Sequence, residues 1–199
     1  MLLAAAMCFI FTSCENDDGS GYIFKYDISG NPRTLDPQSA KDDSAILLIA
    51  NIFEGLLRLD ENGDVKPAVA ESYTVSEDGL TYKFKLREDI FWYDGEDFEE
   101  QCTAHDFVFA LKRLFNPSAK SPVASTLFCI KNSQLINKGF VPVDQLGVTA
   151  DGDFELTITL DYPNPLFPVL LTTAPAMPCS EKFFEQTEGR YGLGADKIA

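Results

Sequence analysis

Histidine and the common catalytic motifs are almost absent from this sequence. Its 199 residues include one histidine, His105, and a lone histidine does not by itself make a histidine-rich metal site or a complete catalytic triad. No glycine-rich phosphate loop, HExxH motif or GxSxG motif occurs. We therefore expect no enzyme activity, no metal and no cofactor.

Basic residues are also few. The chain has 16 Lys and Arg residues against 31 Asp and Glu residues, for a net charge of −15. Such a balance repels phosphate backbones and the anionic inner leaflet of a membrane. Nucleic acid is therefore excluded as a partner. We interpret adjacent acidic pairs such as Glu99 and Glu100 as solvated surface.

Closely spaced cysteine pairs are missing as well. None of the five cysteines forms a CxxC pair, which excludes a zinc ribbon and a thioredoxin-type motif. Cys8 and Cys14 belong to the N-terminal segment, and three others remain: Cys102, Cys129 and Cys179. An odd number predicts at least one free buried thiol, or a cysteine that pairs outside the chain.

The first 21 residues have the composition of a targeting segment rather than of a folded domain. Residues 1–12 are apolar but too few to span a bilayer, which needs roughly 20 residues. They lead into Phe11-Thr12-Ser13-Cys14, which resembles the lipobox of bacterial lipoproteins. We expect residues 1–14 to be a signal peptide with lipid attachment at Cys14, with a plain secretory signal as the alternative. Residues 15–21 are polar and glycine-rich, which predicts a flexible tether.

Several segments of the remaining chain have the composition or alternation of β-strands. Residues 81–86 and 154–160 alternate polar and apolar side chains, as half-buried strands do. Gly79 and Gly152 lie in the turns of two predicted hairpins. The predicted strands are residues 22–28, 56–59, 72–75, 81–86, 90–93, 148–150 and 154–160.

Helices are predicted between these strands. Residues 44–53 form an apolar segment with the candidate caps Asp42, Asp43 and Ser44, and we interpret it as a helix, although a strand also fits. Thr103 and Asp106 have capping-box spacing at the start of the clearest helix. Shorter helices are predicted within residues 123–136, after Pro165 and over residues 181–187. We assign the aromatic residues Trp92, Tyr93 and Phe98 to the core. The mixed order, without a regular βαβ repeat, indicates an α+β fold.

The middle of the chain contains a longer sequence motif. Residues 70–90 read AESYTVSEDGLTYKFKLREDI. The matching positions are Ala70, Asp78, Gly79, Thr81, Tyr82, Phe84, Leu86, Arg87 and Asp89. Short elements at residues 34–37, 53–56, 92–95, 103–107, 116–117 and 121–125 fit in the same order. From residue 22 onward, the chain resembles the bacterial extracellular solute-binding proteins of family 5, the oligopeptide- and dipeptide-binding lipoproteins of ABC transporters.

The resemblance implies a periplasmic-binding-protein-like type II fold, α/β in its lobes. Known members are longer, so the chain resembles an N-terminal fragment of one. Residues 22–53 and 174–199 would then be parts of lobe one. Residues 54–173 would be the smaller, β-rich domain, and the second lobe would lie outside this chain.

The resemblance also implies a function. The protein would capture oligopeptides outside the cytoplasmic membrane, anchored there by lipid only, and deliver them to the permease and ATPase subunits of an importer. The ligand would lie along residues Lys41, Asp42 and Asp43. Within the family, dipeptides, nickel, haem or a signalling peptide are alternative ligands. A secreted hydrolase or a structural lipoprotein whose remaining part is missing are the alternatives outside it.

Overall fold

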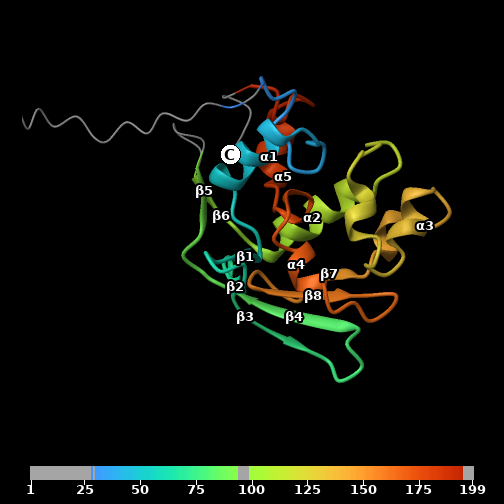
Figure 1. Ribbon diagram of the computed structural model, residues 1–199. Helices are drawn as coiled ribbons and strands as arrows, with labels where there is room; N and C mark the ends of the chain where they lie inside the picture. The colour runs from blue at the N-terminus through green and yellow to red at the C-terminus, as the bar shows by residue number, and fades with distance from the viewer. Residues whose placement is uncertain (1–27, 29, 94–98, 195–199) are drawn as a thin grey trace, which may run out of the picture.

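The computed structural model describes residue 28 and residues 30–93 and 99–194, which form a mixed α/β fold. A four-stranded antiparallel sheet lies at one end of the molecule, and the longer helices stack above it (Figure 1). The order of strands in the sheet is β3-β4-β8-β7. Their bounds are Ala70–Val75 for β3, Thr81–Leu86 for β4, Val148–Ala150 for β7 and Glu155–Thr159 for β8.

The sheet follows from the alternation in the sequence. Tyr82, Phe84 and Leu86 are buried, whereas the lysines between them face solvent. On the neighbouring strand, Ile158 pairs with Tyr82 and Leu156 pairs with Phe84, so both strands bury the same face. Each fully buried aromatic or aliphatic side chain contributes about 1.5–3 kcal/mol. Strand β3 pairs antiparallel with β4, and β7 pairs antiparallel with β8, so both predicted hairpins are confirmed.

Two small antiparallel pairs accompany the sheet. Strand β1 (Leu57–Leu59) pairs with β2 (Val65–Pro67), and β5 (Phe91–Tyr93) pairs with β6 (Glu99–Gln101). The expected strands at 56–59 and 90–93 are therefore confirmed, whereas β2 and β6 were not predicted. Strand β6 reads EEQ, with no β-branched or aromatic residue, and β2 contains a proline, so neither has the composition that marks a strand.

Helix α2 (Ala104–Phe115) lies between the sheet and the other long helices (Figure 1). Its residues Phe107, Leu111 and Leu114 recur at helical spacing and are buried. At its start, the backbone N–H of Thr103 donates to the Asp106 carboxylate at 2.7 Å. This contact satisfies a group just before the first turn and confirms the expected helix start.

Helix α1 (Asp43–Ile52) settles the helix-or-strand question for this segment. The Asp42 carboxylate caps it by accepting the backbone N–H of Ala45 at 2.9 Å. Ile49 packs into the core, while Ile46 and Ile52 are about half exposed. The remaining helices are short: η1 (Ala124–Leu127), α3 (Ser133–Asn137), η2 (Val143–Gln145), α4 (Phe167–Leu170), η3 (Ala174–Ala176) and α5 (Glu181–Gln186).

One continuous core connects α1, α2 and the sheet. Phe167 of α4 packs edge-on against Tyr82 of the sheet, with ring centroids 4.9 Å apart. Cys102, Cys129 and Cys179 are buried free thiols, as the odd number predicted. Among the described residues, no helix is long and apolar enough to cross a membrane.

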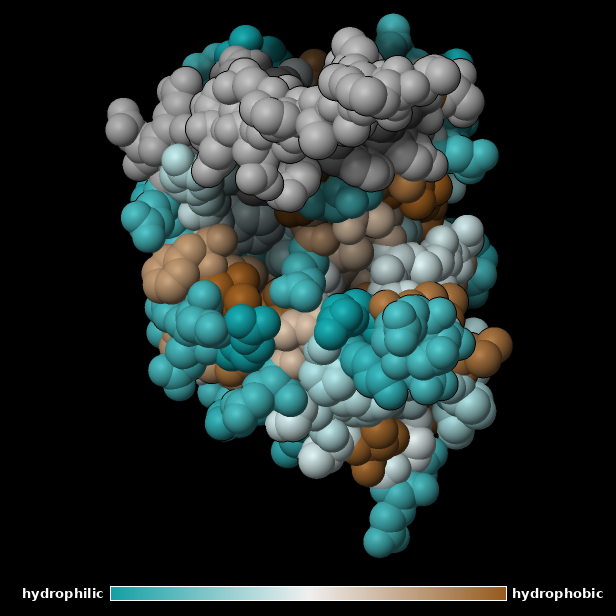
Figure 2. All heavy atoms as spheres, turned by 60° about the vertical axis from the view of Figure 1, so that its left-hand side comes forward, coloured by the Kyte–Doolittle hydropathy of each residue, from teal (hydrophilic) through white to brown (hydrophobic). Residues whose placement is uncertain are grey.

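One assignment to the core was wrong. Trp92 is buried as expected, but Tyr93 is 65% exposed because side chains on the short strand β5 point alternately inward and outward. Phe98 and the predicted strand at 22–28, except for residue 28, lie outside the described residues. On the face in Figure 2, apolar surface forms separate patches among hydrophilic residues rather than one continuous area.

Candidate functional site

A tight turn leads into the segment that we predicted to lie along a ligand. The Asp36 carboxylate accepts the backbone N–H of Gln38 at 3.1 Å and the Ser39 hydroxyl at 2.9 Å. The Asp36 carbonyl accepts the backbone N–H groups of Ser39 and Ala40, at 3.0 and 2.9 Å. Short polar residues form such turns because the side chain bonds to nearby backbone groups. We call residues 34–40 the 34–40 turn.

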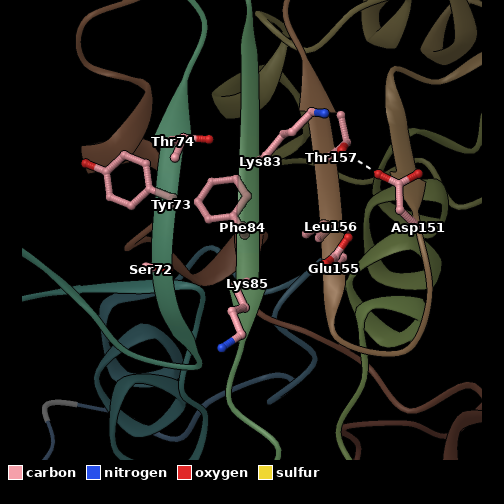
Figure 3. A pocket seen from close by; sticks show the side chains of 10 residues that line it. All are labelled: Ser72, Tyr73, Thr74, Lys83, Phe84, Lys85, Asp151, Glu155, Leu156 and Thr157. Carbon is pink, nitrogen blue, oxygen red and sulfur yellow. Dashed lines mark hydrogen bonds between the residues drawn. The ribbon is translucent and has the colours of Figure 1, made fainter.

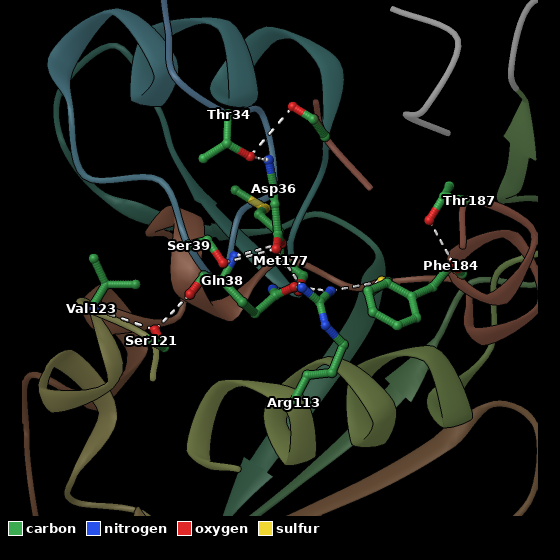
Figure 4. Close-up of polar contacts among 12 residues, drawn as sticks. Thr34, Asp36, Gln38, Ser39, Arg113, Ser121, Val123, Met177, Phe184 and Thr187 are labelled. Atoms are coloured by element: carbon green, nitrogen blue, oxygen red, sulfur yellow. Dashed lines mark hydrogen bonds and ion pairs between the residues drawn. The ribbon is translucent and has the colours of Figure 1, made fainter. Parts of the chain in front are cut away.

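The side chain of Arg113 extends from helix α2 to this turn (Figure 4). One guanidinium nitrogen, Nη2, forms an ion pair with Asp36 at 2.5 Å. The other, Nη1, donates to the Gln38 side-chain oxygen at 3.0 Å and to the Cys179 sulfur at 3.1 Å. The guanidinium also lies over the ring of Phe184, 4.3 Å from its centroid. A single side chain thus joins α2, the 34–40 turn and the segment around Cys179.

Sequence reasoning gave Arg113 a different role. It lies in the last turn of α2, where positive charge favours the helix dipole, and that was the role we expected. The match at residues 34–37 marked Asp36 as part of a motif, but no local pattern indicates which basic residue pairs with it.

The groups around the ion pair are neutral at physiological pH. Burial raises the pKa of the Cys179 thiol to about 11, although the positive charge of Arg113 opposes this change. Burial also raises the pKa of Tyr191 well above its ordinary value. Among these groups, Asp36 is the one that forms the ion pair with Arg113.

Gly192, near the C-terminal end of the described chain, hydrogen-bonds to the first residues of the 34–40 turn. Its carbonyl accepts the Leu35 backbone N–H at 2.7 Å and the Thr34 hydroxyl at 3.3 Å. Gly192 has φ of +71°, and a Cβ atom added there would overlap the backbone nitrogen of Asp36. Only glycine therefore fits at this position without moving the turn.

Residues Lys41, Asp42 and Asp43 follow the turn directly, and we call them the 41–43 segment. Lys41 and Asp43 are exposed, and Asp42 has the extended backbone conformation, with φ −91° and ψ 147°. Within the part of the chain that the structure describes, the backbone N–H groups of Lys41 and Asp42 donate to no protein acceptor. These two N–H groups are therefore without a protein partner among the described residues.

The family signature residues belong to the scaffold rather than to this segment. Tyr82, Phe84 and Leu86 are core residues of β4, and Ala70 begins β3. Asp78 accepts the backbone N–H of Leu80 in the hairpin turn, and Gly79 there has φ of +70°. Arg87 and Asp89 form an exposed bidentate pair at 3.0 and 3.1 Å, and Thr81 is partly exposed on β4.

A hollow of about 220 Å³ lies on the sheet (Figure 3). Strands β3, β4 and β8 line it with polar side chains, among them Lys83, Lys85 and Glu155. Thr157 donates to Asp151 at its rim, at 2.6 Å. The sheet and α1 lie at opposite ends of the molecule (Figure 1), so this hollow is separate from the 41–43 segment.

A candidate metal site is absent from the described residues. No cluster of three or more His, Cys, Asp or Glu side chains could hold a metal ion there. His105 is exposed and lies 3.5 Å from the Asp153 carboxylate. Cys14 lies outside the described residues.

The comparisons with known proteins agree on one family. The family model described as bacterial extracellular solute-binding proteins, family 5 Middle, matches residues 64–195. The dipeptide-binding protein of Lactococcus lactis subsp. cremoris is 31% identical over 188 residues, which cover 94% of this chain and 34% of that protein.

Two solved structures are similar to this one. The substrate-binding domain of an oligopeptide ABC transporter from Bacillus anthracis is 40% identical, with a TM-score of 0.80, over 83% of this chain and 31% of that one. Listeria monocytogenes OppA bound to peptide is 29% identical, with a TM-score of 0.79, over 83% and 32%. The chain thus spans about a third of the length of these relatives. It belongs to the bacterial extracellular solute-binding proteins of family 5, which are binding proteins and not enzymes.

Proposed function

We propose that the protein captures peptides outside the cytoplasmic membrane and delivers them to the permease and ATPase subunits of an ABC importer. The observation that carries the proposal is the 41–43 segment, in which Lys41 and Asp43 are exposed and the backbone N–H groups of Lys41 and Asp42 have no protein partner among the described residues. The chain that contains this segment belongs to a family of solute-binding proteins. An extended peptide can pair with such a segment as an added strand, which gives affinity with little dependence on side chains. The peptide bound to the similar Listeria protein supports this ligand class.

The architecture that we propose divides the chain as the family resemblance implies. Residues 54–173 contain the four-stranded sheet and would form the smaller domain of a periplasmic-binding-protein-like type II fold. Residues 22–53 and 174–199 would belong to lobe one, and they contact each other where the 34–40 turn donates to the Met177 and Gly192 carbonyls. Closure of a second lobe over the 41–43 segment would trap the peptide.

Oligopeptides are the ligand that we favour, and dipeptides are the second candidate. The similar proteins carry both descriptions: a dipeptide-binding protein and an oligopeptide transporter component. Membership of a family of binding proteins removes the secreted hydrolase from the earlier alternatives. Lipid attachment at Cys14, with residues 15–21 as the tether, remains our proposal for the anchor. It predicts that a labelled fatty acid enters the wild-type protein and not Cys14→Ala.

The test is thermal unfolding with and without ligand pools. It uses this chain, and the complete gene product where that is longer. A pool of synthetic peptides longer than two residues should raise the midpoint, because a ligand that binds only the folded state stabilises it. A dipeptide pool that gives the larger shift would assign the dipeptide branch. A shift with nickel or haem and none with either peptide pool would contradict the proposal.

A further inference from the structure

The 34–40 turn holds the first end of the 41–43 segment, and α1 holds the other end, because Asp42 is the N-cap of α1 and Asp43 is its first residue. The Asp36 carboxylate accepts hydrogen bonds from the Gln38 backbone N–H and the Ser39 hydroxyl. The Asp36 backbone carbonyl accepts the N–H groups of Ser39 and Ala40. The last of these bonds ends at Ala40, the residue just before Lys41. Any rotation of Asp36 would therefore move the start of the 41–43 segment.

Arg113 holds two residues of this turn at once. It reaches Asp36 with Nη2 and the Gln38 side chain with Nη1, so the planar fork fixes both their distance and their orientation. Two further hydrogen bonds hold Gln38. Its side-chain nitrogen Nε2 donates to the Met177 backbone carbonyl at 2.9 Å, and its backbone carbonyl accepts the Ser121 hydroxyl at 2.5 Å. Lysine could not reproduce this arrangement, because its ammonium group lacks the planar fork.

We propose that Arg113 is a positioning residue for ligand binding: it fixes the 34–40 turn and thereby holds the main chain of residues 41–43 in place before the peptide arrives. This inference rests on the proposed function. A segment that is ordered in advance loses less conformational entropy on binding, so affinity rises without any new contact to the ligand.

The variants separate positioning from stability. Arg113→Gln removes the fork and the charge, and Arg113→Lys keeps the charge without the fork. The double variant Asp36→Asn/Arg113→Gln leaves no unpaired buried charge, so it can fold where a single variant does not. Lys112→Gln is the matched control, because Lys112 is the next residue on the helix but pairs with the exposed Asp144 at 2.8 Å.

The first measurement needs no ligand. The amides of Ser39 and Ala40 should exchange about tenfold faster with solvent in Arg113→Gln, in Arg113→Lys and in the double variant. Backbone order parameters of residues 41–43 should fall in the same variants. The amide of Phe84, in the sheet, should keep its protection in the double variant, which shows that the loosening is local. Unchanged exchange at Ser39 and Ala40 in the double variant would overturn the proposal.

The second measurement uses the tightest single peptide from the pool, in the complete gene product where that is longer than this chain. The dissociation constant should rise about tenfold in Arg113→Lys and in the double variant and stay at the wild-type value in Lys112→Gln. A purely stabilising role predicts wild-type affinity in any variant that folds, and that result would also overturn the proposal. If the wild-type protein binds no peptide, the proposed function fails on its own, and the exchange experiment still decides whether Arg113 orders the segment.

Discussion

Asp36 and Arg113 are 77 residues apart in the chain, yet their side chains form an ion pair in which they are only 10% and 15% exposed. Such a pair is held by its geometry and by the other hydrogen bonds of both groups, because removing two charges from water is costly. Its loss should therefore be visible in stability as well as in the order of the 41–43 segment.

Asp36→Ala should lower the free energy of unfolding by about 3–5 kcal/mol, because it leaves the Arg113 charge buried without its anionic partner. The double variant Asp36→Asn/Arg113→Gln should lose less than this single variant. Urea unfolding followed by circular dichroism measures both values. A single variant that is as stable as the wild-type protein would show that the ion pair is not intact in solution.

Gly192→Ala should destabilise the protein more than Gly189→Ala. Both glycines have positive φ, +71° and +81°, so both substitutions carry the same kind of backbone strain. Only at Gly192 would the new Cβ overlap the 34–40 turn, whereas no atom lies within 4 Å at Gly189. Thermal unfolding of the two variants gives the difference directly, and equal losses would contradict the close contact with Asp36.

Asp106 predicts a specific pH dependence. Burial raises its pKa from 3.8 to about 6, against the hydrogen bond from the Thr103 backbone, and the nearby Glu100 carboxylate adds to the increase. Between pH 4 and 6 the unfolded chain ionises this group more readily than the folded one. Its contribution therefore favours folding at low pH and is lost as the pH rises through about 6.

Asp106→Asn should remove this loss, because it keeps an oxygen acceptor for Thr103 but does not ionise. Relative to the wild-type protein, it should gain on the order of 2–3 kcal/mol of stability between pH 4 and pH 7. Urea unfolding across this range measures the difference. Thr103→Ala is the control: it removes the hydroxyl beside Asp106, at 3.4 Å, and leaves the titrating group in place. A pH profile of Asp106→Asn parallel to that of the wild-type protein would refute the raised pKa.

Asp42→Pro and Asp42→Ala separate main-chain recognition from side-chain recognition. Both lose the carboxylate cap of α1, which costs about 1 kcal/mol, but only proline also removes the backbone N–H. If the peptide pairs with the 41–43 main chain, Asp42→Pro should weaken peptide binding clearly more than Asp42→Ala. Isothermal titration with one peptide distinguishes them, and equal affinities would exclude this N–H as a contact.

The sequence was informative where structure depends on local periodicity. Residues 81–86 and 154–160 showed their alternation directly, and Thr103 and Asp106 marked the start of α2 through their spacing. The strands β2 and β6 were missed because β6 has no β-branched or aromatic residue and β2 contains a proline, so neither has the composition of a strand. Tyr93 was misplaced because a cluster of aromatic residues does not show which of them faces the core.

The candidate site was less accessible from the sequence. The family resemblance indicated residues 41–43, but nothing local showed what holds them. The contacts of Arg113 with Asp36, Cys179 and Phe184 join segments that are distant in the chain, and such pairings follow from the tertiary fold. The structure also shows that the signature from Ala70 to Asp89 is largely scaffold.

The three buried thiols, Cys102, Cys129 and Cys179, have a consequence for the lifetime of the protein. A thiol reacts as its thiolate and only where a reagent can reach it, so the fold shields all three from oxidation. In the oxidising compartment that we propose, each global unfolding event would expose three groups able to form disulfides with one another or with other chains. Unfolding would then be irreversible, and the survival of the protein there would depend on the rate of unfolding rather than on the equilibrium free energy.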